Sequence, residues 1–329
     1  MRSMTEKQQK LLSLLDAVPV TATGSQRFNP RPEHMGRGFT MRIKRLYIYR
    51  GKYLAFVWAQ LRKRMRFGAD AGLPARTFWG RIFMLPAHDK NARIIRETGK
   101  LGGAEDALSR FLICSLTEAD VFYDIGANYG FYSALAQEII VHGEVHVFEP
   151  SPSIFQYLQQ IKKDSACRMY LNNVALTERS GAVDFFDCAS DEASGKSTTV
   201  EAVALGPHRR NCRKVSVCGL TLDEYSAKHA TPTFIKLDVE GAELQVLLGG
   251  ARLLKRTAPT IAIELWSGED LSQYSLKVLD FLEPLGYVPF RILPDGDLEK
   301  TGYPHLRAWL PGARAEVNFV FRKVIEKLP

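Results

Sequence analysis

The sequence lacks the usual marks of a metal-binding, secreted or membrane-spanning protein. Its five cysteines form no C-x-x-C pair, and their odd number and scatter predict reduced thiols in a cytoplasmic protein. No apolar run approaches the roughly 20 residues that a transmembrane helix needs, and no signal-peptide pattern opens the chain. The histidines after residue 76 have no metal-like or triad-like spacing. We therefore expect no metal site built on cysteine or histidine.

Acidic residues are scarce in the first part of the chain. Residues 1–100 contain 21 Lys and Arg against 6 Asp and Glu, and residues 41–66 contain nine Lys and Arg and no acid. Within that basic stretch, apolar side chains such as Trp58 and Leu61 fall on one helical stripe. Such a helix can lie peripherally on an anionic membrane, or it can pack on the rest of the protein with its basic face in solvent. No stacking groove or recognition motif accompanies the charge, so we expect no nucleic-acid partner.

One glycine-rich stretch, V-F-Y-D-I-G-A-N-Y-G, predicts a cofactor-binding turn. An apolar run ends at Asp124, the backbone turns through Gly126 and Gly130, and residues with helical spacing follow. A strand, a glycine turn and a helix in this order are typical of nucleotide-binding α/β sheets. Asn128 and Phe131 stand where a dinucleotide fingerprint has glycines. This disfavours a nicotinamide-dependent oxidoreductase, which we keep as an alternative.

Glu149 is the second candidate cofactor residue. It stands 23 residues after Gly126, at the end of the predicted strand 144–148. A carboxylate there can accept both hydroxyls of an adenosine ribose. The alternative role, support of the next helix, is less attractive because Ser151 and Pro152 already form a suitable helix start.

A third group of charged residues follows in T-P-T-F-I-K-L-D-V-E-G-A-E. Lys236, Asp238 and Glu240 alternate along a predicted strand and therefore point to one face. Three charges on a buried strand are costly unless they lie at its carboxyl end, where α/β sheets bind ligands. Glu264, at the end of the next predicted strand, could join the same crevice. The alternative is a purely structural salt-bridge cluster.

Several other elements are predicted from periodicity and turn residues. We expect a β-rich lead-in at 77–100, a helix at 105–114, strands at 169–176 and 182–186, and a helix at 243–254. Residues 187–214 are small and polar and then basic, which predicts a long loop. Loops of this length are often lids or substrate-binding segments.

The ordered motifs D-I-G-A-N-Y-G-F-Y-S, V-F-E-P-S, N-N-V-A-L, T-L-D-E-Y and F-I-K-L-D-V-E-G-A-E resemble the FkbM family of methyltransferases. The resemblance covers roughly residues 78–321. It implies a class I, Rossmann-like doubly wound sheet of seven strands, an S-adenosylmethionine cofactor, and methyl transfer to a hydroxyl oxygen. On the matching positions it implies a cofactor turn and a ribose-binding acid, with an adenine-side position near Asn173. These residues are Asp124, Gly126, Asn128, Gly130, Glu149 and Asn173.

From the motifs and the resemblance together we predict an O-methyltransferase acting on a saccharide, a glycolipid or a natural product. The methyltransferase domain would span residues 77–329, after a basic extension at 1–76. Asp238 is the first choice for the base that takes the hydroxyl proton, Glu240 the second, and Lys236 would support the acid or the acceptor. We expect no metal, although Asp238, Glu240 and Glu264 could hold a divalent ion. A non-enzymatic binder of anionic polymers or membranes is the remaining alternative.

Overall fold

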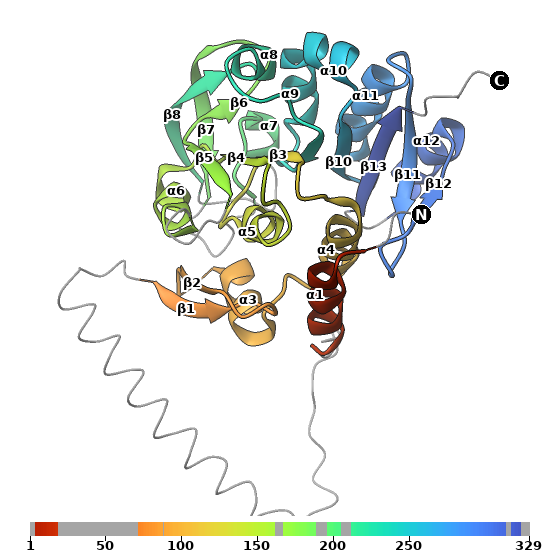
Figure 1. Ribbon diagram of the computed structural model, residues 1–329. Coiled ribbons are helices and arrows are strands. Elements are labelled where there is room, and N and C mark those ends of the chain that lie inside the picture. The colour runs from red at the N-terminus through yellow and green to blue at the C-terminus, as the bar shows by residue number, and fades with distance from the viewer. Residues whose placement is uncertain are drawn as a thin grey trace, which may run out of the picture.

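The computed structural model describes residues 4–18, 72–87, 89–161, 167–188, 196–204, 212–313 and 317–323. Its centre is an eight-stranded sheet with the strand order β12-β11-β13-β10-β9-β3-β4-β5 (Figure 1). The strands are β3 (Val121–Ile125), β4 (Glu144–Phe148), β5 (Arg168–Asn172), β9 (Phe234–Leu237), β10 (Thr260–Leu265), β11 (Tyr287–Ile292), β12 (Leu298–Lys300) and β13 (Val317–Lys323).

The five strands from β5 to β10 are parallel, and β13 inserts antiparallel between β10 and β11. The predicted doubly wound α/β fold is therefore confirmed. The expected count of seven strands is wrong by one, because the short strand β12 pairs with the outer edge of β11.

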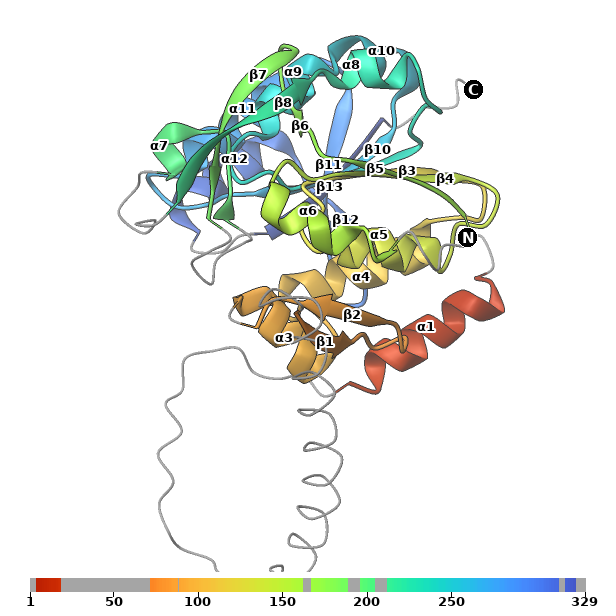
Figure 2. The same ribbon diagram turned by 90° about the vertical axis from the view of Figure 1, so that its left-hand side faces the viewer.

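Helices cover both faces of the sheet (Figure 2). Alternate side chains of each strand point to opposite faces, so Phe122 and Phe234 join one apolar cluster, and Tyr123 and Ile235 join the other. The first cluster packs under α4 (Ala104–Ser115), α5 (Phe131–Gln137) and α6 (Pro152–Leu158). The second packs under α8 (Leu222–Ser226), α9 (Glu243–Gly249), α10 (Ala251–Thr257), α11 (Ser272–Leu282) and α12 (Tyr303–Gly312). The helix predicted at 243–254 is therefore two helices.

The N-terminal elements dock on the α4 side of the molecule (Figure 1). Helix α1 (Glu6–Asp16) buries Leu11 and Leu15, and its Gln8 Nε2 donates to the carbonyl oxygens of Ile113 at 2.5 Å and Leu116 at 3.0 Å. The lead-in predicted as β-rich is a hairpin followed by a helix: β1 (Leu73–Arg76), β2 (Ile82–Leu85) and α3 (Lys90–Thr98).

The predicted domain boundary after residue 76 falls between β1 and β2 of this hairpin, and the division of the chain at that point stays a prediction. The basic amphipathic helix predicted at 41–66 lies outside the described residues, and its membrane role stays a prediction. Within the described residues, no helix is both long and apolar enough to cross a membrane.

A small second sheet lies on the α8 side, with the strand order β6-β8-β7. It contains β6 (Ala175–Leu176), β7 (Gly181–Asp187) and β8 (Arg213–Leu220), so the strand predicted at 169–176 is divided between two sheets. Cys188 and Cys212 form a disulfide at the end of this sheet, and the prediction of five reduced thiols is wrong for this pair. Because disulfides are rare in reducing compartments, the cysteines no longer support a cytoplasmic location.

Candidate active site

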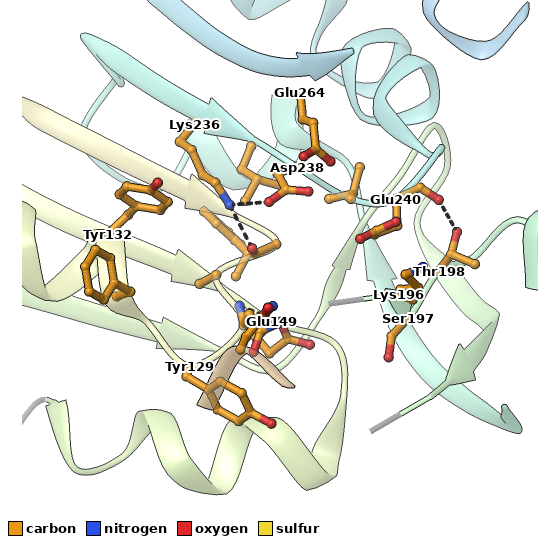
Figure 3. A pocket seen from close by; sticks show the side chains of 18 of the residues that line it. Tyr129, Tyr132, Glu149, Lys196, Ser197, Thr198, Lys236, Asp238, Glu240 and Glu264 are labelled. Carbon is orange, nitrogen blue, oxygen red and sulfur yellow. Dashed lines mark hydrogen bonds and ion pairs between the residues drawn. The ribbon is translucent and has the colours of Figure 1, made fainter. Parts of the chain in front are cut away.

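A cavity opens at the carboxyl ends of β3, β4 and β9 (Figure 3). Its volume is ≈ 690 Å³, which is within the range of small-molecule and cofactor sites. The chain adds β4 and β5 on one side of β3 and then places β9 and β10 on the other. Ligands of doubly wound sheets bind at such a change of direction. The walls come mainly from within residues 89–95, 101–105, 125–129, 148–150, 174–176, 196–199 and 236–242.

The predicted glycine turn forms one wall. Gly126 has a φ of +76°, and a Cβ at this position would lie 1.8 Å from the carbonyl oxygen of Asp238. Glycine is therefore required here by the neighbouring loop of the protein, whatever binds in the cavity. Asn128 also has a positive φ, of 50°, and its backbone N–H donates to Glu149 Oε2 at 2.9 Å. The turn and the ribose-binding candidate are thus one hydrogen-bonded unit.

Three other predicted cofactor residues are not among the described residues that line the cavity. Asp124 is fully buried beneath it. A Cβ at Gly130 would meet the side chain of Ile161 at 2.1 Å, so this glycine permits close packing beyond α6. Asn173 Nδ2 donates to the Glu149 carbonyl oxygen at 2.8 Å. These three residues support the neighbours that line the cavity. Their direct contact with a cofactor stays a prediction.

Glu149 lines the cavity with a buried carboxylate. Its two oxygens accept backbone N–H groups, Oε2 from Asn128 and Oε1 from Ser151, each at 2.9 Å. Burial raises the pKa of Glu149 to about 7, although the two backbone donors oppose this shift. Ser151 also caps α6 as expected, through a bond from the Ile154 N–H to its Oγ at 3.2 Å. Each Glu149 oxygen keeps a lone pair for a ribose hydroxyl.

Lys236 is buried at the centre of the site, between the carboxylates of Asp124 and Asp238. Its Nζ donates to Asp238 Oδ2 at 3.0 Å and to the Gly126 carbonyl oxygen at 3.1 Å, and it lies 3.8 Å from Asp124 Oδ1. Burial alone would lower the pKa of Lys236, but Asp238 and Asp124 outweigh it and raise the pKa. The ammonium therefore stays charged and ties the Asp238 carboxylate to the glycine turn.

The predicted acidic group does assemble. Carboxylate oxygens of Asp238, Glu240 and Glu264 lie within 4.8 Å of one another. Strand β9 ends at Leu237, so Asp238 and Glu240 lie in the following loop, at the mouth of the sheet. Three carboxylate oxygens could form part of a divalent-cation site, or they could accept hydroxyl groups of a polar ligand.

Two further walls were not assigned to the site from the sequence. One contains Glu105 from α4 and Tyr132 from α5. The Tyr132 hydroxyl donates to Glu105 Oε2, and Asn318 Nδ2 of β13, which does not itself line the cavity, donates to Glu105 Oε1 at 2.8 Å. Lys236 Nζ lies 5.6 Å from the centre of the Tyr132 ring. Glu105 and Asn318 are 213 residues apart in the sequence, and no motif marks either one.

The other wall comes from the long loop predicted at 187–214. Some of its described residues line the cavity, which supports the prediction that this loop is a substrate-binding segment. Lys196, Ser197 and Thr198 line the cavity. Thr198 Oγ1 donates to the Glu240 carbonyl oxygen at 2.8 Å, which joins this loop to the acidic group (Figure 3). Ser197 Oγ accepts the backbone N–H of Cys188 at 3.0 Å, close to the disulfide.

The fold is that of a doubly wound α/β protein, and its cavity lies at the switch of strand direction, where such sheets bind nucleotide cofactors. The chain belongs to the FkbM methyltransferase family, because the model of the methyltransferase FkbM domain matches residues 124–289. This match contains the glycine turn, Glu149 and the Lys236–Asp238 pair. It leaves the oxidoreductase alternative without support.

The chain is similar to the hexuronic acid methyltransferase AglP of Haloferax volcanii, with 27% identity over 173 residues. That match covers 52% of this chain and 65% of the relative, which is less than two thirds of its length. An FkbM methyltransferase structure from Methylobacillus flagellatus has 18% identity and a TM-score of 0.39, covering 63% of this chain and 44% of the other. A Thermotoga maritima S-adenosylmethionine-dependent O-methyltransferase structure has 11% identity and a TM-score of 0.37, covering 79% and 80%.

Proposed function

We propose that the protein transfers a methyl group from S-adenosylmethionine to a hydroxyl oxygen of a saccharide or saccharide-containing molecule. Family membership supports methyl transfer, and the similarity to a hexuronic acid methyltransferase supports a saccharide acceptor. The observation that carries the proposal is the Lys236–Asp238 pair, which joins the glycine turn to Glu240 and Glu264 in one cavity.

The residues of the cavity fit the proposed cofactor. Glu149 offers two buried oxygens to a vicinal diol, and Gly126 brings bare backbone to the same wall. Val174, Ala175 and Leu176 supply an apolar surface beyond Glu149, which suits a purine ring. When bound, S-adenosylmethionine supplies an electrophilic methyl group on a sulfonium, whose carbon–sulfur bond breaks as the carbon–oxygen bond forms.

The chain's own residues would orient the acceptor and remove its proton. Asp238 Oδ2 is bonded to Lys236, and its other oxygen is free of that bond and can accept the hydrogen of an acceptor hydroxyl. As the oxygen attacks the methyl carbon, its proton passes to Asp238. Glu240, Glu264 and Thr198 form a polar rim that can hold the other hydroxyls of a sugar. Positioning of this kind supplies several kcal/mol of a typical rate enhancement.

Binding followed by transfer tests the proposal. We expect S-adenosylhomocysteine, but not NAD, to raise the melting temperature of the full chain. Labelled S-adenosylmethionine should then methylate at least one member of a panel of neutral and acidic saccharides, free or lipid-linked. Stabilisation by NAD alone would contradict the cofactor assignment. A binder of S-adenosylhomocysteine that methylates only a protein or nucleic-acid substrate would contradict the acceptor class.

A further inference from the structure

Glu105 has an unusual environment for a carboxylate that lines a cavity. Tyr132 donates to one of its oxygens and Asn318 to the other, so the group is fixed in one orientation. Among the described residues, however, no Lys or Arg nitrogen forms an ion pair with it. Glu105 is half-buried in the cavity wall, and a carboxylate that is partly withdrawn from water without a cationic partner is costly.

The charges that face Glu105 come from strand β9 and the loop that follows it. Burial raises the pKa of Glu105, the negative charge of Asp238 raises it further, and Tyr132, Lys236 and Asn318 oppose the shift. Lys236 is already bonded to Asp238 and to the Gly126 carbonyl oxygen, so it does not neutralise Glu105 directly. A cationic ligand in the cavity would favour the ionised form of Glu105 and complete its charge balance.

The order of the strands indicates which cation this is. Across the sheet, the cavity begins with the apolar surface after β5, continues past Glu149 after β4 and Gly126 after β3, and reaches Lys236 on β9; Glu105 of α4 lines it as well. S-adenosylmethionine has the same linear order of parts: purine, ribose, sulfur and amino acid. With the purine and ribose at the β5 and β4 end, the amino-acid part extends toward Glu105. The acceptor side remains at Glu240 and Thr198, which lie on the other side of Asp238 from Tyr132 (Figure 3).

We propose that Glu105, held by Tyr132 and Asn318, binds the α-ammonium group of the amino-acid part of S-adenosylmethionine. The inference rests on the proposed use of this cofactor. It adds a cofactor residue from helix α4, outside the region that the family model matches. It also gives a role to β13, whose Asn318 fixes the orientation of the carboxylate.

The test measures, by titration calorimetry with the full chain, how tightly two proteins bind each of two ligands. The two ligands are S-adenosylhomocysteine and its deamino analogue, which keeps the carboxylate and loses only the ammonium group. The two main proteins are the wild type and Glu105→Gln. Loss of one charge-assisted contact corresponds to roughly 10- to 100-fold in affinity. We expect the wild type to prefer S-adenosylhomocysteine by about this factor, and Glu105→Gln to bind the two ligands within about threefold of each other.

The controls separate this inference from its premises. Glu97→Gln changes an exposed acid of α3 and should keep the full preference of the wild type. General damage to the cavity in Glu105→Gln would weaken both ligands equally and leave their ratio unchanged, which would overturn the inference. Equal binding of the two ligands by the wild type would overturn it without using any variant. Failure of the wild type to bind S-adenosylhomocysteine at all would instead reject the proposed function.

Discussion

Gly126→Ala is the substitution whose effect the structure defines best. The added Cβ would stand 1.8 Å from the carbonyl oxygen of Asp238, and this atom belongs to backbone that cannot rotate away. The residue also has a φ of +76°, which costs a residue with a side chain about 1–2 kcal/mol. Forced displacement of a packed neighbour adds roughly 1–3 kcal/mol. The expected loss is therefore about 2–5 kcal/mol of the free energy of unfolding, from a typical total of about 5–15 kcal/mol.

Gly286→Ala is a matched control for this prediction. Gly286 has a φ of +79°, almost the same as Gly126, but a Cβ there would meet no atom within 4 Å. It should therefore lose only the conformational part, about 1–2 kcal/mol. Urea denaturation of both variants measures the difference, and calorimetry with S-adenosylhomocysteine measures the effect on the site. If the two variants lose equal stability, the close contact between the glycine turn and the Asp238 loop is not a constraint, and our account of Gly126 is wrong.

Three other predictions concern charge. Asp238→Asn should lower turnover by roughly 10²–10⁴-fold and change the affinity for S-adenosylhomocysteine by only about a few fold. Unchanged turnover in this variant would mean that Asp238 has only a structural role. A chelator added to the wild type shows separately whether Asp238, Glu240 and Glu264 use a metal ion. Because ionised Glu149 is the better acceptor for ribose hydroxyls and its pKa is about 7, calorimetry should show affinity falling about tenfold from pH 8 to pH 6. A Glu149→Gln protein should bind weakly with no such dependence, and an equally steep fall in that variant would disprove the assignment. Burial lowers the pKa of His146 from 6.5 to about 4. The stability that neutral His146 gives to the folded state is therefore present above pH 6.5, and the free energy of unfolding falls by up to about 3 kcal/mol as the pH drops toward 4. Glu149 and Glu243, whose pKa values are raised to about 7, act on stability in the opposite direction. The effect of His146 is therefore measured as the difference in unfolding free energy between the wild type and His146→Gln across this pH range. If unfolding free energy depends on pH with the same slope in both proteins, the prediction for His146 is wrong.

Local chemistry made the Glu149 and Asp238 side of the cavity predictable. Strand β4 contains Val145, Val147 and Phe148, and α6 starts with a Ser-Pro cap; these two elements place Glu149 at the mouth of the sheet. Parallel strands bring their carboxyl ends to one edge, which is why Asp238 and Glu264 meet although they belong to different strands. The strand itself ended earlier than expected, but the alternation of Lys236 and Asp238 still indicated the right side of the sheet.

The remaining parts depend on contacts between distant segments. Glu105 and Asn318 meet only because β13 inserts between β10 and β11 and brings its polar end below α4. The role of Gly130 depends on Ile161, which no spacing rule connects with the glycine turn. Cys188 and Cys212 are 24 positions apart in the sequence, and an odd number of scattered cysteines does not indicate which two of them pair. Such contacts are fixed by tertiary packing, so a single sequence carries little signal for them.

The most direct test of the central claim is transfer of an isotopically labelled methyl group from S-adenosylmethionine to a saccharide, followed by nuclear magnetic resonance of the product. The account predicts that the label appears on a hydroxyl oxygen of the sugar with the wild type and is reduced to near background with Asp238→Asn. A label found on nitrogen or carbon, or equal yields from the two proteins, would contradict the assignment of this cavity as an O-methyltransferase site.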